Sequence, residues 1–252
     1  MFEYKSTVPY HTSAILASAL DTLTLSYRKR QGEVARLTDL CSCLSRVGRK
    51  AAAASVGLPF AMPADSFLLD VLEKWEGPLW QSLTPNCSLN EDRIWIQSIV
   101  LRGITEDKLI SSSHNYRDWN PAYRCTTVQE MLSLFLSCCS YATASLAHTA
   151  DFPCKVSPPF PNLFSDNILQ DGTVSNVSRP KNCGVKSVPV IAGLHSSRSV
   201  GDMLESLHSQ VKKLKLRQFH QFGNSGLEND EYSSNLDQLL DLRECYHEEF
   251  NV

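Results

Sequence analysis

The sequence predicts a mixed α/β protein. Apolar residues recur at helical spacing in several separate stretches, and short runs rich in β-branched and aromatic residues lie between them, as is typical of buried strands. With 252 residues, 42% of them hydrophobic, the chain can bury one large core or two modest ones. This composition differs from that of fibrous, collagen-like and disordered chains.

Two helices and a strand are predicted in the first quarter of the chain. The broad apolar face of 11–23 predicts a buried helix with a Thr N-cap at its start. After a basic turn, 34–47 is amphipathic and predicts a second helix, which Gly48 ends. The apolar segment 51–63 is interrupted by prolines, which favours a buried extended strand over a helix.

Helix and strand signals alternate through the middle of the chain. A short helix is predicted over 67–74, and the β-branched and aromatic run 93–101 predicts a strand. Thr127 and Glu130 have the spacing of a capping box, in which each side chain bonds the backbone N–H of the other residue. The box predicts the start of a helix that continues through Cys139.

The last hundred residues begin with a stretch that breaks this alternation. Its several prolines and weak periodicity predict a long surface loop over 153–187. A core strand is predicted over 188–192, and helices over 199–216, capped by Ser199, and over 230–247. We expect these two helices to pack antiparallel, with two apolar stripes facing each other: Leu207, Val211 and Leu214 on the first, and Leu236, Leu239 and Leu240 on the second.

Charge and hydropathy exclude several classes of protein. A net charge of −3 offers no field to hold a polyanion, so we expect no nucleic-acid binding. The longest apolar stretch, 51–64, is shorter than the roughly 20 residues of a transmembrane helix. The amino terminus lacks the basic and apolar regions of a secretory signal, so we expect an intracellular protein.

The nine cysteines predict neither a disulfide framework nor a zinc site. Their number is odd, and none forms a C-x-x-C pair. Cys41, Cys43, Cys138 and Cys139 lie in apolar, helical stretches, where a free cysteine behaves as a small hydrophobe. We therefore predict no metal site and no cofactor.

Catalytic motifs are also missing from the sequence. It contains no G-x-S-x-G, H-E-x-x-H, G-x-x-x-x-G-K-[ST] or G-x-G-x-x-G, and its seven histidines are dispersed. Charge is nevertheless uneven, because a short basic run precedes an acidic final segment: the run is Lys212, Lys213, Lys215 and Arg217. These residues form either a solvated helix face or a docking surface for a protein partner.

Several stretches resemble a known family. Ser13–Leu20, Leu37–Leu40 and Leu58–Phe60 are similar, in this order, to the core helix and intermediate domain of the tubulin superfamily. The misato family of diverged tubulin-like proteins is more similar still. The matching stretches are Pro9–Thr22, Ser98–Ile104, Cys125–Glu130, Cys154–Ser165, Val188–Val190 and Leu207–Tyr246.

The resemblance implies a tubulin-like fold and covers only the second half of a misato protein. It divides the chain into a core-helix segment (1–24), an intermediate domain (25–152), the polar loop (153–187) and a strand with a carboxy-terminal helical pair (188–252). The glycine-rich nucleotide loop of the amino-terminal half has no counterpart in the sequence, so we expect no GTP binding.

Two expectations about single residues follow from this resemblance. In a chain without the amino-terminal half, the helix 11–23 should be partly exposed, so Ile15, Leu16 and Leu20 should not all be covered. Asp39 matches an acidic tubulin position that helps to place water at a neighbouring subunit's nucleotide. The alternative for Asp39 is a surface carboxylate that the helix dipole favours in the first turn.

The function that the resemblance implies is not enzymatic. Misato proteins are tubulin-like proteins of mitochondrial distribution and morphology, including fusion and network formation. The chain would then be cytosolic and peripheral to the mitochondrial outer membrane, attached through protein partners. The alternatives are a GTP-dependent assembly protein, and an adaptor for cytoskeletal proteins or chaperonins that docks through its charged faces.

Overall fold

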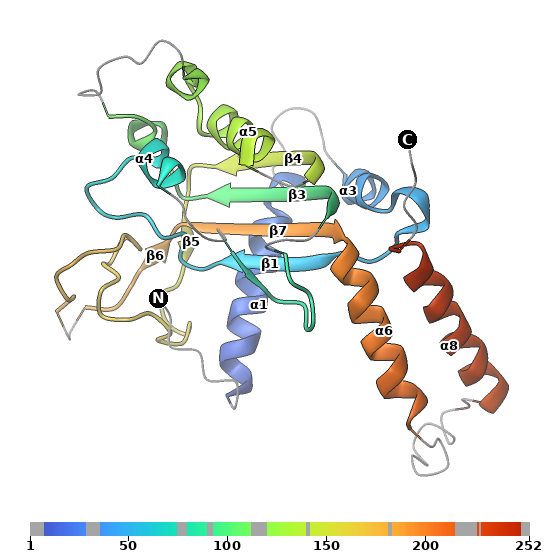
Figure 1. Ribbon diagram of the computed structural model, residues 1–252. Coiled ribbons are helices and arrows are strands. Elements are labelled where there is room, and N and C mark those ends of the chain that lie inside the picture. Colours follow the sequence, from blue (N-terminus) through green and yellow to red (C-terminus); the bar gives the residue numbers. More distant parts are fainter. Residues whose placement is uncertain are drawn as a thin grey trace.

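The computed structural model describes residues 8–28, 36–74, 80–89, 93–111, 120–139, 142–180, 183–214, 226 and 228–247. A five-stranded sheet of order β2-β1-β7-β3-β4 lies at its centre (Figure 1). Its strands are β1 (Ala53–Gly57), β2 (Gln81–Ser82), β3 (Ile94–Arg102), β4 (Ala142–Ala150) and β7 (Val190–Ser197). A small second sheet pairs β5 (Cys154–Lys155) with β6 (Ser187–Val188).

The helices and the sheet make this a mixed α/β fold, as predicted. The α-helices are α1 (Pro9–Leu23), α2 (Leu25–Arg28), α3 (Leu37–Leu44), α4 (Leu68–Glu73), α5 (Val128–Cys139), α6 (Arg198–Lys212) and α8 (Asn229–Glu244). Three 3₁₀ turns are η1 (Arg46–Gly48), η2 (Glu106–Lys108) and η3 (Pro121–Arg124). No helix in the described part of the chain has the length and apolar character needed to cross a membrane.

The sheet combines antiparallel and parallel pairs. β1 and β3 both run antiparallel to the central strand β7, and β4 runs parallel to β3. At the middle of the sheet, Ile99 of β3 lies between Gly193 of β7 and Ala147 of β4. The connection between the parallel strands passes through α5, because a parallel pair needs a long crossover.

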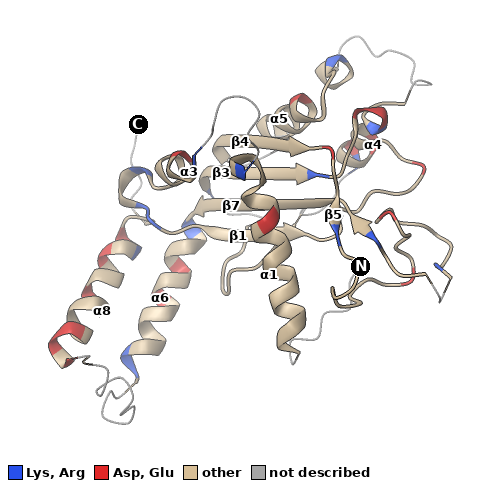
Figure 2. Cartoon of the chain, turned by 180° about the vertical axis from the view of Figure 1, so that it is seen from behind, with Lys and Arg blue, Asp and Glu red and all other residues tan. Residues whose placement is uncertain are grey.

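Helices cover both faces of the sheet. α1 lies on one face, and Figures 1 and 2 show it behind and in front of the strands, respectively. Its Ile15 packs in a cluster with Val190 and Ala192 of β7. Ile191 points to the opposite face and joins Leu132 of α5, since successive strand residues face opposite sides. α6 and α8 lie on the same face as α5, at the other end of the sheet.

The amino-terminal helix is confirmed, but its predicted Thr N-cap is wrong. α1 begins at Pro9, and Val8 occupies the N-cap position without a side-chain hydrogen bond. Proline suits the first turn because its fixed φ is already helical and a backbone N–H is not needed there. The helix therefore starts two residues before the predicted position.

The next two predicted elements are shorter in the structure. α3 ends at Leu44, and η1 follows it, with Val47 in the left-handed region at a φ of 58°. The strand predicted over 51–63 is limited to β1, Ala53–Gly57. Pro59 lies two residues after the strand, and it cannot donate a hydrogen bond to a neighbouring strand, so it prevents the strand from continuing.

The middle predictions agree well with the structure. β3 matches the strand predicted over 93–101 to within one residue at each end. The capping box is confirmed: the Glu130 N–H donates to Thr127 Oγ1 at 3.2 Å, and the Thr127 N–H donates to Glu130 Oε2 at 3.3 Å. α5 then continues to Cys139. β4 was not predicted, since its small and polar residues carry no strand signal.

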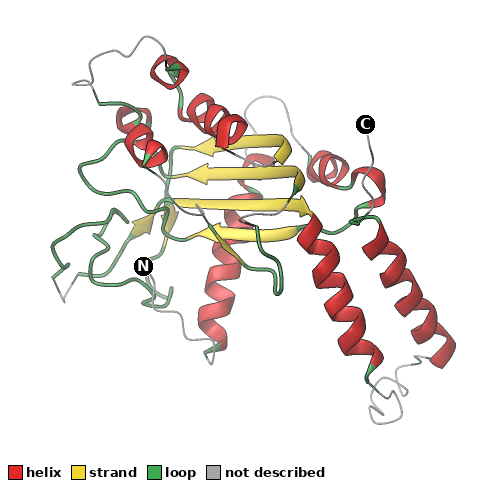
Figure 3. Ribbon diagram, viewed as in Figure 1, coloured by secondary structure: helices red, strands yellow, loops and turns green. Residues whose placement is uncertain are grey.

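The segment 153–187 is largely irregular and lies beside one end of the sheet (Figure 3). It is not confined to the surface, however, because several of its apolar side chains are buried in the α1-side core: Val156, Leu163, Phe164, Ile168 and Val185. The predicted surface loop is therefore corrected to an irregular segment that contributes to the core. The sequence did not predict this burial because these apolar residues are separated by polar ones without a helical or strand period.

The two carboxy-terminal helices form a hairpin, but the predicted seam is not a buried core. α6 begins at Arg198, after an N-cap at Ser197 and not at Ser199, and α8 ends at Glu244. Leu207 and Leu214 are 43% and 48% exposed. The hairpin projects away from the sheet, so its helices shield each other on one side only (Figure 1).

Candidate functional site

The face of α1 turned away from the sheet is apolar and exposed. We call it the outer face of α1 and define it by Tyr10, Ser13, Leu16, Ala17 and Leu20, all of which are exposed. Leu16 and Leu20 are 47% and 58% exposed, whereas Ile15 is 5% exposed on the sheet side. This confirms the expectation that 11–23 is only partly covered.

Charged residues are nearly missing from this helix. Asp21 is the only Asp, Glu, Lys or Arg in α1, and the ribbon in Figure 2 accordingly lacks charge colours along most of its length. A surface helix usually carries charged residues on its solvent side. An exposed helix face with uncharged, apolar residues is instead typical of a protein contact.

An ion-pair cluster fixes the end of α1 against the sheet. The Asp21 carboxylate accepts hydrogen bonds from Arg102 Nη1 at 2.5 Å and from Arg28 Nη2 at 2.6 Å. Burial alone would raise the pKa of Asp21, but these two guanidinium groups outweigh it and hold that pKa below its usual value. Arg102 is buried and also donates to the carbonyl groups of Phe152 and Pro153. The orientation of the outer face is therefore set by a rigid anchor.

A chain of polar side chains crosses the sheet on the opposite face. Ser55 of β1 contacts His195 of β7, with 2.7 Å between Oγ and Nε2. His195 Nδ1 lies 3.2 Å from Gln97 Oε1 of β3, and Gln97 Nε2 donates to Ser145 Oγ of β4 at 2.9 Å. A serine beside a histidine that a third group orients is the arrangement of a nucleophilic catalyst.

The burial of this network argues for a structural role. Ser55, Gln97 and His195 are fully buried, and burial lowers the pKa of His195 to about 3. The neutral ring donates from Nδ1 to Gln97 Oε1, so Nε2 accepts from the Ser55 hydroxyl. The Trp80 ring covers the histidine, with 5.1 Å between ring centroids. The network thus joins four strands and is buried at Ser55, His195 and Gln97, whereas Ser145 at its β4 end is exposed.

Gly193 leaves the space that this network fills. A Cβ at this position would lie 2.6 Å from His195 Nε2 and 2.8 Å from Ser55 Oγ. The volume above the glycine is therefore already occupied by the imidazole and the hydroxyl group. No local sequence pattern predicts this network, because only the strand register brings its residues together.

The residues singled out from the sequence lie elsewhere. Asp39 is exposed in the first turn of α3, and its Oδ2 accepts a hydrogen bond from the Arg36 N–H at 2.8 Å. This geometry corresponds to the alternative of a helix-favoured surface carboxylate. Lys212 and Lys213 are exposed at the end of α6, whereas 215 and 217 lie outside the described residues.

The described part of the chain is thus an α/β fold with an exposed apolar face on α1 and a largely buried polar network across the sheet. No protein-family model matches it. Protein misato of Drosophila melanogaster is 34% identical over 243 residues, which cover 94% of this chain and 42% of the relative. Protein misato homolog 1 of Homo sapiens is 36% identical over 247 residues, and that of Danio rerio is 32% identical over 247 residues.

The chain is homologous to the misato family, as its sequence resemblance predicts. It spans 42% of the length of these three relatives, a share compatible with the second half that the resemblance indicates.

Proposed function

We propose that this chain is the association-bearing part of a non-enzymatic, tubulin-like protein of the misato family. In this proposal the protein acts in mitochondrial distribution and morphology, including mitochondrial fusion and network formation. It is peripheral to the mitochondrial outer membrane and attaches through protein partners. The observation that carries the proposal of association is the outer face of α1.

The energetics of that face favour a contact. Full burial of a leucine side chain contributes about 1.5–3 kcal/mol, and Leu16 and Leu20 each have about half of their surface exposed. Covering both therefore offers about 2 kcal/mol, to which Tyr10 and Ala17 add. No charge on this face would have to be desolvated in return.

The relatives suggest what covers the face. In the misato proteins the matched segment is joined to additional sequence that makes up more than half of their length. We assign the outer face of α1 to a contact with that additional sequence. This agrees with the resemblance of Ser13–Leu20 to the core helix of the tubulin superfamily, which is expected to be buried.

A non-catalytic role is supported by the burial of the Ser55–His195–Gln97 group, whose arrangement is the one that most resembles a catalytic triad. Ser55, His195 and Gln97 have the right spacing for proton transfer but lie under Trp80 with no exposed surface. The rival proposal of a GTP-dependent assembly protein is tested directly by calorimetry on the 252-residue chain. We expect no GTP binding, and a micromolar dissociation constant would refute that expectation.

The association proposal is tested in cells that lack their misato protein. The chain, or the same chain carrying Leu16→Ser and Leu20→Ser, is expressed together with the additional sequence of a misato relative, and the mitochondrial network is scored by microscopy. We expect the wild-type chain to restore the network and the double variant to fail while it remains folded, because about half of each leucine side chain is already exposed. Val177→Ser is the matched control, since Val177 is 73% exposed elsewhere on the surface.

Two results would contradict the proposal. If the double variant restores the network fully, the outer face of α1 is not the contact. If Val177→Ser abolishes the rescue as completely as the double variant does, the loss is not specific to the outer face of α1. The adaptor alternative is favoured by the exposed Lys212 and Lys213. Reversing both charges should abolish capture of cytoskeletal proteins or chaperonins if these lysines dock a partner.

A further inference from the structure

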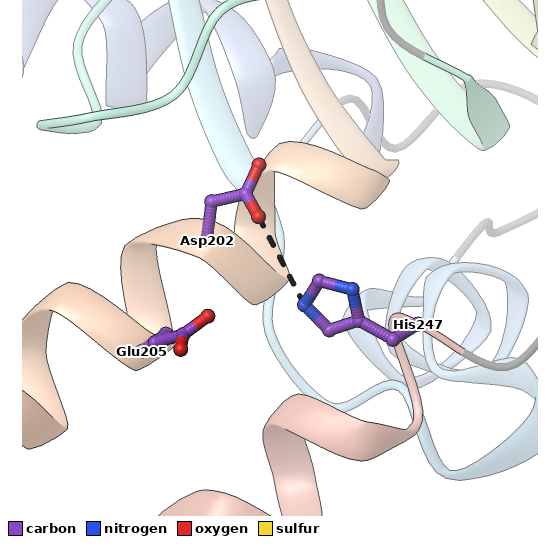
Figure 4. Close-up of side chains that lie close together, drawn as sticks. All are labelled: Asp202, Glu205 and His247. Atoms are coloured by element: carbon purple, nitrogen blue, oxygen red, sulfur yellow. Dashed lines mark ion pairs between the residues drawn. The ribbon is translucent and has the colours of Figure 1, made fainter.

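Three potential metal ligands meet where α6 and the end of α8 come together. They are Asp202 and Glu205 of α6 and His247, which follows α8, and one ligand atom of each lies within 4.8 Å of the others. Figure 4 shows the two carboxylates and the imidazole around one shared space. Asp202 and Glu205 are three residues apart, so they project from the same face of the helix.

The imidazole is held in place by its neighbours. Tyr246 is fully buried, and its hydroxyl group both donates to the Ala51 carbonyl and accepts from the Ala51 N–H. Gly201 permits the close approach of the ring, because a Cβ there would lie 2.8 Å from His247 Nε2. A larger residue at 201 would push the ring away from the two carboxylates.

The ring nitrogen that faces this space lacks a hydrogen-bond partner. His247 Nε2 is shielded from solvent and makes no hydrogen bond in the described part of the chain. Its distance to Asp202 Oδ1 is 3.9 Å, which is too long for a hydrogen bond. A buried polar atom normally has a hydrogen-bond partner or binds an ion, so this unpaired nitrogen beside two carboxylates indicates a ligand between them.

We propose that Asp202, Glu205 and His247 bind a divalent zinc ion. One imidazole nitrogen and two carboxylate oxygens suit Zn²⁺, whereas Mg²⁺ and Ca²⁺ prefer ligand sets made only of oxygen. Three protein ligands leave a fourth position for water or for a group of a partner protein. The ion ties α6 to the chain that follows α8, and so it fastens the hairpin at its sheet end.

A neighbouring arginine competes for one of the ligands. Arg243 Nη2 donates to Glu205 Oε2 at 3.1 Å. The ion must use the other oxygen of Glu205 or displace the guanidinium group, and the positive charge of Arg243 opposes its binding. Removal of Arg243 should therefore tighten zinc binding, an effect that a merely structural histidine would not produce.

The experiment measures Zn²⁺ binding to the full reduced chain by isothermal titration calorimetry at neutral pH. We expect Asp202→Asn and His247→Gln each to weaken binding by about 100-fold, since loss of even an outer-shell partner of a metal ligand costs about 10–100-fold. Arg243→Gln should bind more tightly than the wild-type chain. His208→Gln is the matched control on α6, and it should bind as the wild-type chain does.

A further measurement separates this site from zinc binding by the cysteines. Co²⁺ is added as a spectroscopic probe, and a thiolate charge-transfer band that accounts for all bound cobalt would overturn the proposal. Equal zinc affinity of the wild-type chain, Asp202→Asn and His247→Gln would overturn it as well. Asp202 is 60% exposed, so its variant keeps the test valid even where His247→Gln fails to fold.

Discussion

The buried His195 should make the stability of this protein depend on pH. Its pKa falls from an ordinary value of 6.5 to about 3 in the folded chain, because burial penalises the charged ring. Below pH 6.5 the unfolded chain takes up a proton that the folded chain does not, so stability falls as the pH falls. The loss continues down to about pH 3, where the folded ring is also protonated.

The expected size of this effect follows from linkage. Each pH unit below 6.5 costs about 1.4 kcal/mol, so the free energy of unfolding should drop by about 2 kcal/mol between pH 7.5 and pH 5 through this one histidine. Urea unfolding of the wild-type chain and of His195→Gln over this range measures it. The variant removes the contribution of His195 and leaves that of His148, whose pKa is also lowered by burial.

The decisive quantity is the difference between the two pH profiles. The wild-type chain should lose about 2 kcal/mol more than the variant, and equal slopes would refute the reasoning. Should the variant not fold, the ring carbon shifts of His195 in the wild-type chain answer the same question by NMR. A ring that titrates near pH 6.5 in the folded protein would show that it is not enclosed with Ser55 and Gln97.

Three further predictions concern stability. Gly193→Ala should lower the free energy of unfolding by about 1–3 kcal/mol, because the new Cβ would collide with the polar network. A Cβ at Gly184 would have no neighbour within 4 Å, so Gly184→Ala should be nearly neutral, and chemical denaturation compares the two variants. Leu204→Ala should lower the free energy of unfolding by about 2–5 kcal/mol, because this side chain is buried. Leu239 is only partly buried, so Leu239→Ala should lower it by about half as much. Tyr246→Phe should lower the free energy of unfolding by about 1–3 kcal/mol, measured by thermal unfolding, since it leaves a partly buried backbone N–H and carbonyl of Ala51 without their partner.

Elements that carry their own local signal could be predicted from the sequence. Thr127 and Glu130 mark the start of α5 because a capping box is made by residues three apart, and β3 has a continuous run of β-branched and aromatic residues. β4 lacks such a run because it is the edge strand and half exposed, so small and polar residues suffice there.

The candidate sites depended on contacts between distant segments. His195 was one of seven dispersed histidines in the sequence, and only the pairing of β7 with β1 and β3 places it between Ser55 and Gln97. In the same way, His247 meets Asp202 only because α8 returns along α6. The exposed side of α1 was foreseen because the family resemblance, and not helical periodicity, indicated a missing cover.

The central position of β7 has a consequence for how the chain folds. β1 and β3 are not neighbours in the sheet, since the strand between them comes from far along the sequence. During synthesis both strands emerge from the ribosome well before β7 and must wait with unpaired edges. Such non-local pairing slows folding and leaves strand edges unpaired, and unpaired edges promote aggregation. Nascent chains that stop before β7 should therefore need chaperone protection and should aggregate without it.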